Sequence, residues 1–216
     1  MKVKEKKTFV MKFNTSRQFD FPLKIQMNGF NNNLQVVSET RLLGVILTDD
    51  LKWGVNTTFI CQKASKRLWI LRRMKILEID PAIILEVYVK EVRSVLELAV
   101  PAWHSGLTRE QSLQIEKIQK LAVNIILNNH QKGVNRLSYS RSLNALGLES
   151  LEERRFKLCK NFAKKCLKSR HTDMFQENPS AYQTRSKKLF SEHQTFSERA
   201  FMSPLVYLTR LLNSMN

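Results

Sequence analysis

The sequence of 216 residues predicts an α+β fold that is mostly α, with a short N-terminal β segment followed by a bundle of helices. Residues 8–47 contain short apolar and β-branched runs separated by turn residues, a pattern typical of strands. After Trp53 the apolar residues recur at helical spacing. Several of these helical stretches begin with a residue that caps helices, such as Asp80 or Ser150.

The β segment is predicted as four short strands, with turns at the asparagine clusters between them. Asn28-Gly29 is a turn signal, although the stretch from there to Leu34 is longer than a two-residue hairpin loop. The four predicted strands are Thr8–Phe13, Leu23–Met27, Leu34–Val37 and Leu42–Leu47.

The first helix is predicted from about Thr57 to Lys75. Residues 61–75 hold six basic side chains and no acidic one. At helical spacing, apolar and basic residues separate onto opposite faces, so this helix is expected to pack on a core with one side only. The apolar face contains Ile60, Ala64, Leu68 and Leu71, and the basic face contains Lys63, Lys66, Arg67 and Arg73.

Five further helices follow, each with a start signal in the sequence. Asp80-Pro81 is expected to open a helix that runs to about Val100 and ends or kinks at Pro101. A capping box at 108–111 opens the next helix. That helix is predicted to run to about Asn129. The other three predicted helices are 139–146, which ends at Gly147, then 150–169, and finally 205–212, which follows Ser203-Pro204.

The chain is predicted to divide into three regions, at 1–55, 56–170 and 171–216. The first contains the strands and the second contains the helical bundle. Residues 171–202 are polar, of mixed charge and poor in apolar anchors, so we expect a loosely ordered linker before the last short helix.

Basic residues dominate the composition, with 36 Lys and Arg against 19 Asp and Glu and a formal net charge of +17. This excess predicts a polyanionic partner, with nucleic acid first and an anionic membrane surface second. No stretch reaches the roughly 20 apolar residues of a membrane span, and the N-terminus lacks the apolar region of a signal peptide. Three cysteines without metal-ligand spacing agree with a reducing compartment, so we expect a cytoplasmic or nuclear protein with no membrane partner.

Two helices carry the candidate phosphate contacts. The basic face of the first helix lacks the interleaved acids that a merely solvated face usually shows, although a solvated face is the alternative. Trp69 lies near that side and is expected either to rest on sugars or bases or to pack in the core. In the helix 150–169, acid at the start and base toward the end also suit the helix dipole. The candidate nucleic-acid-binding residues are Lys7, Lys63, Lys66, Arg67, Arg73, Lys160, Lys164, Lys165 and Lys168.

Catalytic and metal sites are not predicted. Asp49-Asp50 is the kind of carboxylate pair that polymerases use to hold metal ions, but it has no third carboxylate partner upstream. We interpret it as a polar turn with N-cap character. The four histidines lie far apart, and no phosphate-binding glycine motif is present.

Six motifs in order resemble the end of the palm and the thumb of a reverse transcriptase from a non-LTR (LINE-type, jockey-like) retrotransposon. Lys7-Thr8-x-x-Met11-x-Phe13 resembles the palm motif that follows the catalytic Asp pair, although Lys4 stands where the family often has Asn. Leu43-Gly44-Val45 resembles the primer-grip strand. The other matches are Leu51-x-Trp53 with the helix after it, Tyr88 with Leu96–Ala99 and Trp103, Ile115–Leu121, and Leu146–Arg155.

The resemblance implies a palm-tail remnant over 1–55 and a thumb-like domain over 56–170. It implies an RNA-directed DNA polymerase fragment that holds the template–primer duplex in the full enzyme and is not catalytic alone. Mg²⁺ is implied for that full enzyme, and no cofactor is expected for this chain. The partners expected are RNA or DNA template–primer and the upstream catalytic region of the intact element. The alternative is a helical interaction or self-association module with exposed sheet edges.

Overall fold

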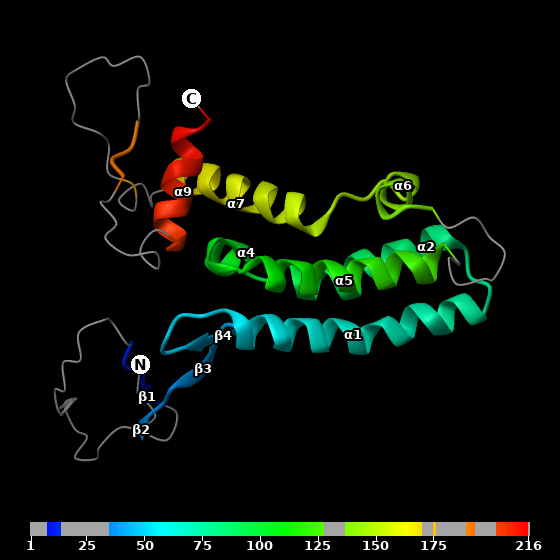
Figure 1. Cartoon of the computed structure of the whole chain (residues 1–216), viewed down its shortest axis with the longest axis horizontal. Helices are drawn as coiled ribbons and strands as arrows, with labels where there is room; N and C mark the ends of the chain where they lie inside the picture. Colours follow the sequence, from blue (N-terminus) through cyan, green and yellow to red (C-terminus); the bar gives the residue numbers. More distant parts are fainter. Residues whose placement is uncertain are drawn as a thin grey trace. The chain divides into compact units, whose positions relative to one another are not determined.

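A computed structural model describes residues 8–13, 35–127, 137–169, 175, 189–192 and 202–215 (Figure 1). Of these residues, 66% are helical and 9% are in strands, so the predicted class, α+β and mostly α, is confirmed. The chain forms two compact units, Met1–Asn56 and Thr57–Asn216. Four sequence predictions lie outside the described residues: Lys7 as a nucleic-acid contact, the strand Leu23–Met27, the turn at Asn28-Gly29 and most of the linker 171–202.

The N-terminal unit contains two small two-stranded sheets. β1 (Phe9–Val10) pairs in parallel with β2 (Gln35–Val36), and both are shorter than the strands predicted there. β3 (Glu39–Leu42) pairs antiparallel with β4 (Val45–Thr48).

The predicted strand Leu42–Leu47 is wrong, because the chain reverses inside it. Leu42 pairs with Val45, which leaves Leu43 and Gly44 as a two-residue hairpin loop. Both have positive φ angles, +48° and +93°, as the tight hairpin turn of the I′ type requires. Glycine adopts this conformation without strain, whereas Leu43 adopts it at a cost.

β4 is anchored to the start of the first helix. The backbone N–H of Ile46 donates to Oδ1 of Asn56 over 3.1 Å. Val45 and Ile46 of β4 and the nearby Trp53 are buried.

The predicted first helix is present as α1 (Gly54–Ile76). Its predicted apolar face is confirmed, since all four side chains of that face are at most 3% exposed. A helix that buries one stripe and solvates the other is stabilised mainly by packing.

The helix predicted from Pro81 to Val100 is shorter and contains a wide turn. Asp80 caps it as predicted, with Oδ1 accepting from the N–H of Ala82. The helical run consists of α2 (Pro81–Val87), the π-helix η2 (Tyr88–Arg93) and α3 (Ser94–Leu96). Pro101 does not end this run: it lies in the first turn of α4 (Val100–Trp103), where its missing N–H is not needed.

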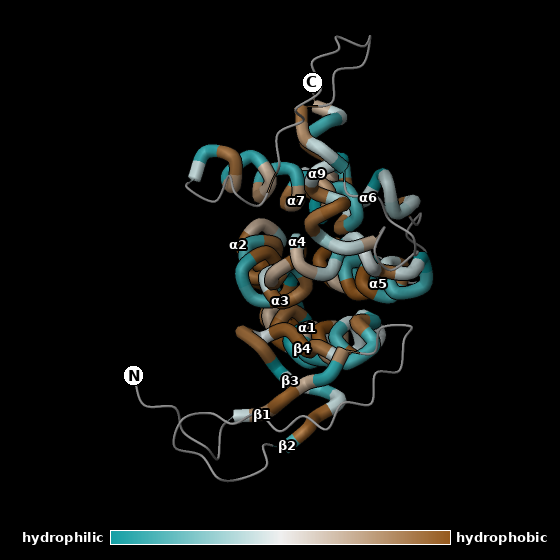
Figure 2. The backbone as a smooth tube through the Cα atoms, turned by 90° about the vertical axis from the view of Figure 1, so that its left-hand side faces the viewer, coloured by the Kyte–Doolittle hydropathy of each residue, from teal (hydrophilic) through white to brown (hydrophobic). Residues whose placement is uncertain are grey.

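Three of the remaining helices begin at the caps predicted for them, Thr108, Ser150 and Ser203. Complete capping boxes form at Thr108 and Ser150, and Ser138 and Ser203 cap with their side chains. Figure 2 shows hydrophobic and hydrophilic residues alternating along these helices, as one-sided burial requires. The bounds are η3 (His104–Gly106), α5 (Arg109–Ile126), α6 (Tyr139–Ala145), α7 (Leu151–Lys168) and α9 (Pro204–Asn213).

α9 packs on the helical bundle. Its buried side chains include Val206, Leu208 and Leu211, and the helix contacts α7, α4 and η3. Ser105 also donates a hydrogen bond to the carbonyl of Met202 over 2.7 Å. This stretch therefore belongs to the core of the second unit.

A buried amide joins four segments of this unit. Gln119 on α5 is 0% exposed. Its Oε1 accepts from the Tyr88 hydroxyl over 2.5 Å. Its Nε2 donates to the carbonyl of Glu149 over 2.9 Å and to the Tyr139 hydroxyl over 3.1 Å. Through Gln119, the η2, α6 and α7 segments are tied to α5.

We predict that Gln119→Leu destabilises the chain by about 2–4 kcal/mol, because it leaves the buried Tyr88 hydroxyl and the Glu149 carbonyl without partners. Urea unfolding measures this change. Gln114→Leu is the matched control, since Gln114 is exposed on the same helix. Equal effects of the two substitutions would contradict a structural role for the buried amide.

Candidate nucleic-acid interface

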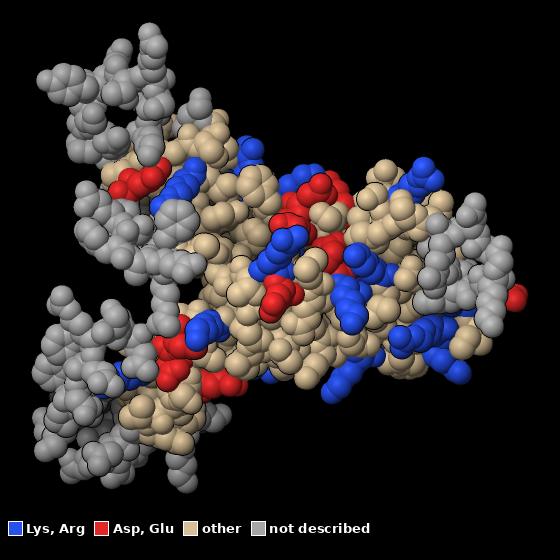
Figure 3. All heavy atoms as spheres, in the orientation of Figure 1, with Lys and Arg blue, Asp and Glu red and all other residues tan. Residues whose placement is uncertain are grey.

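The exposed side of α1 carries an ordered stripe of side chains, which we call the α1 outer face. Its members recur every three or four residues, so they align along one side of the helix. Figure 3 shows Lys and Arg side chains gathered over the part of the surface that α1 occupies. The α1 outer face consists of Gln62, Lys66, Trp69, Arg73 and Ile76, all exposed.

Two cations of this face are free to meet a polyanion. Lys66 and Arg73 have no ion-pair partner among the residues that the structure describes. Trp69 lies between them in sequence and is 59% exposed, so the expectation that it packs in the core is wrong. An indole flanked by two cations can stack on a base or sugar while the cations contact phosphates.

The other basic residues predicted on α1 have different surroundings. Arg67 donates from Nη1 to the carbonyl of Glu91 over 2.5 Å and to its carboxylate over 3.2 Å, so this guanidinium ties α1 to η2. Lys63 is half-buried on the same flank of the helix. Lys75 donates to the carbonyl of Ile126 on α5 over 3.1 Å. The exposed Arg72, which we did not propose as a contact, adds to the charge beside the α1 outer face.

The lysines predicted on α7 divide into two groups. Lys164 and Lys165, together with Lys168, line a groove between α7 and the start of α4. Lys160 is half-buried and does not line that groove. Phe162 also lines this groove and is 40% exposed.

The remaining predicted site residues lie in the N-terminal unit. Leu43-Gly44-Val45, predicted as a strand resembling a primer grip, forms the hairpin turn and the first residue of β4 instead. Leu43 is 92% exposed at the tip. Lys7 lies outside the described residues.

Several residues that carry the family resemblance hold the helices together. Tyr88 and Gln119 hydrogen bond to each other in the core. Trp103 is fully buried and donates to the carbonyl of Leu98 over 2.8 Å. Glu97 accepts from Arg154 over 2.5 Å. These side chains have structural roles in the part of the chain described, and the exposed cations lie elsewhere.

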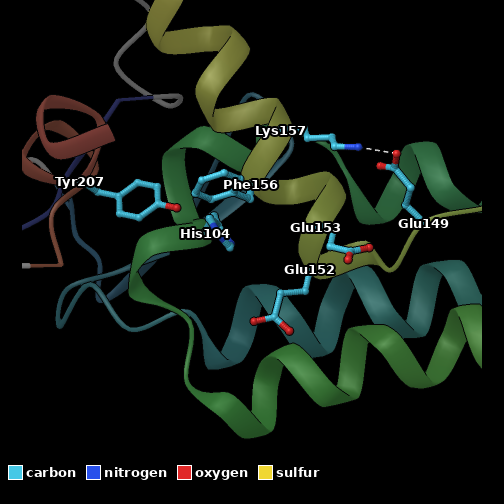
Figure 4. Close-up of a pocket in the computed structure, with 7 residues that line it drawn as sticks. All are labelled: His104, Glu149, Glu152, Glu153, Phe156, Lys157 and Tyr207. Atoms are coloured by element: carbon cyan, nitrogen blue, oxygen red, sulfur yellow. Dashed lines mark hydrogen bonds and ion pairs between the residues drawn. The ribbon is translucent and has the colours of Figure 1, made fainter. Parts of the chain in front are cut away.

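A second hollow, of about 600 Å³, lies where α7, α9 and η3 meet (Figure 4). The rings of His104 and Tyr207 lie edge to face, with their centroids 5.6 Å apart, and Phe156 lies beside them. Two of the acidic residues that line this hollow already have partners. Glu149 pairs with Lys157, and Glu153 completes the capping box of α7.

Burial shifts the pKa values of several side chains in the helical unit. Burial, and secondarily the nearby Arg155 guanidinium, lowers the pKa of His104 from 6.5 to about 4. The Arg155 side chain is 1% exposed and donates from Nη2 to the Ser112 hydroxyl over 2.6 Å. Burial raises the pKa of the Cys61 thiol to about 11 and that of Cys159 to about 12, so neither is a ready nucleophile.

Asp50 has a local structural role. Its carboxylate accepts from the Thr48 hydroxyl over 2.7 Å and from the N–H of Lys52 over 3.0 Å, which lowers its pKa. The predicted polar turn is therefore present. The predicted N-cap is not, because α1 begins at Gly54 and Asp50 bonds within the turn before it.

Within the described ranges, no group of His, Cys, Asp and Glu side chains is arranged to hold a metal ion. None of the helices described there is long and apolar enough to cross a membrane. Comparison of the chain with models of known families, with curated proteins and with solved structures finds no match.

His104 predicts a pH dependence of stability. Its pKa is lower in the folded chain than in the unfolded one, so the unfolded state takes up a proton first as the pH falls. The contribution is fully present above pH 6.5 and is lost as the pH falls toward about 4. We expect the free energy of unfolding to fall more over this range in the native chain than in His104→Gln, measured by urea titrations. Parallel curves would contradict the buried, neutral imidazole.

Proposed function

We propose that this chain binds nucleic acid through the α1 outer face, without sequence readout. The observation that carries the proposal is the exposed Trp69 on one stripe of a helix whose other side is buried. Lys66 and Arg73 lie on the same stripe and have no ion-pair partner among the residues described. The net charge of +17 supports a polyanionic partner. A regular row of cations follows a phosphate backbone without reading base edges, so affinity arises mainly from counterion release.

Within this proposal, the resemblance supplies the form of the ligand. We propose that the chain is a thumb-like piece of an RNA-directed DNA polymerase from a non-LTR retrotransposon, holding a template–primer duplex and not catalytic by itself. Mg²⁺ belongs to the catalytic region of such an enzyme. Three buried free cysteines agree with the cytoplasm or nucleus, where such a ligand is found.

The test is fluorescence anisotropy of a labelled RNA–DNA hybrid at several salt concentrations. For Lys66→Glu/Arg73→Glu we expect a large loss of affinity. For Lys66→Gln/Arg73→Gln we expect the slope of log affinity against log salt concentration to become shallower by about 2, because each phosphate contact contributes about −0.9 to that slope. Sequence changes in the hybrid should alter affinity little.

The matched control is Lys117→Glu/Arg141→Glu, which makes the same change of charge at exposed residues of α5 and α6. If this control weakens binding as much as the α1 variant, only net charge matters and the α1 outer face is not the site. No binding by the native chain at low salt would overturn the proposal itself.

Exposed apolar side chains favour a second candidate function, self-association through the N-terminal unit. Leu43 is 92% exposed, Val36 61% and Leu42 57%, all on or beside short strands. Two-stranded sheets with apolar edges are templates for pairing with another chain.

Size-exclusion chromatography over a range of concentrations tests this candidate. We expect the apparent size of the protein to increase with its concentration. Leu43→Lys should shift the elution toward that of the monomer. Trp69→Lys is the control, because it introduces the same charge on α1. A monomer at all concentrations would contradict self-association.

A further inference from the structure

The groove beside α7 is lined by both apolar and basic side chains. Its volume is about 480 Å³, and its apolar lining includes Ala99, Val100, Pro101 and Leu158. Three exposed lysines, which we call the rim lysines, also line it: Lys164, Lys165 and Lys168. A ligand that fits has a flat apolar body with negative charges beside it.

The break between α3 and α4 contributes residues to the groove. α3 ends at Leu96, and Ala99 turns the chain with a φ of +52° before α4 begins at Val100. Glu97 and Ala99, in the short non-helical stretch between these helices, both line the groove. α7 packs against α4 along this stretch, which gives the groove its second wall.

Phe162 supplies an aromatic surface in the groove. It is 40% exposed, whereas its neighbours one turn away on the same side of α7, Cys159 and Cys166, are buried. The neighbouring Asn161 also lines the groove, and its amide can both donate and accept. A partly exposed ring beside an amide is suited to stacking on a base and bonding to its edge.

The groove is positive because its acid is already neutralised. Glu97, the acid among the described lining residues, accepts from Arg154 over 2.5 Å and lies 3.8 Å from Arg93. The three rim lysines have no ion-pair partner among the described residues. Their charges are therefore available to phosphates on either side of a bound base.

We propose that this groove binds an unpaired nucleotide of the nucleic acid, with the base against Phe162 and the flanking phosphates against Lys164, Lys165 and Lys168. The inference rests on the proposed function and adds a second contact to it. Bases inside a duplex are already stacked, so only a single-stranded stretch can offer a base face to Phe162. The site therefore distinguishes a strand end or overhang from continuous duplex.

The experiment compares the affinity of the full chain for a blunt RNA–DNA hybrid and for the same hybrid with a single-stranded extension. We expect tighter binding of the extended hybrid, and an emission change from a fluorescent base analogue placed in the extension. Phe162→Ala should weaken binding of the extended hybrid by about fivefold or more, which is the lower limit for the loss of one base–aromatic stack. Binding of the blunt hybrid should not change.

Phe156→Ala is the matched control, because Phe156 is a similarly exposed phenylalanine of α7, 45% against 40%, that lines the other hollow. Phe162→Tyr keeps the ring and should keep the preference. Lys164→Gln/Lys165→Gln/Lys168→Gln tests the rim without altering a packed side chain, and should also remove the preference for the extension.

Three outcomes would overturn the proposed nucleotide site in the groove while leaving the α1 proposal intact. The first is no preference for the extended hybrid, and the second is equal effects of Phe162→Ala and Phe156→Ala. The third is binding of phosphatidylserine vesicles that depends on Phe162 while binding of nucleic acid does not. Failure of the proposed function is separate. It appears as loss of all hybrid binding, or as binding that is insensitive to the α1 outer face.

Discussion

The helical unit depends on one constraint: a buried polar side chain must find partners from several segments at once. Gln119 lies inside α5 without exposure, so its amide must be satisfied by the elements around it. Tyr88, Tyr139 and the carbonyl of Glu149 satisfy it, and Glu116 extends the network to the N–H of Leu151 at the start of α7. An apolar side chain at position 119 could pack in several registers, whereas the amide bonds correctly in one arrangement.

Ion pairs fix the outer layers of the same unit and reduce the charge that is left for a ligand. Glu97 accepts from Arg154, and Glu91 accepts from Arg67. Basic residues that look equivalent in the sequence therefore fall into two classes. Arg67 and Arg154 stabilise the packing of helices, while Lys66, Arg73 and the lysines beside Phe162 have no ion-pair partner in the described part of the chain. The acids that make this distinction come from other helices, at separations of 24 and 57 residues.

Helix positions followed closely from local sequence, because capping and one-sided periodicity are local properties. The capping box at Thr108, the helix start at Ser150 and the apolar stripe of α1 are found as predicted. Predictions failed where two conformations were both consistent with a short apolar run. The run Leu42–Leu47 was predicted as one strand, although its Gly44 permits a reversal that completes a hairpin with Glu39–Leu42. Similarly, Pro101 was predicted as a helix end, yet proline is equally suited to a first helical turn.

The amino-acid pattern alone therefore established the helical class, the caps, the buried face of α1 and the excess of positive charge. Tertiary structure decided which charges are free, that Trp69 is exposed, that Phe162 borders a groove and that Tyr88 meets Gln119. The physical reason is the range of the interactions. Capping and helical periodicity act over a few residues, whereas exposure, ion pairing and the lining of a groove depend on side chains that only folding brings together.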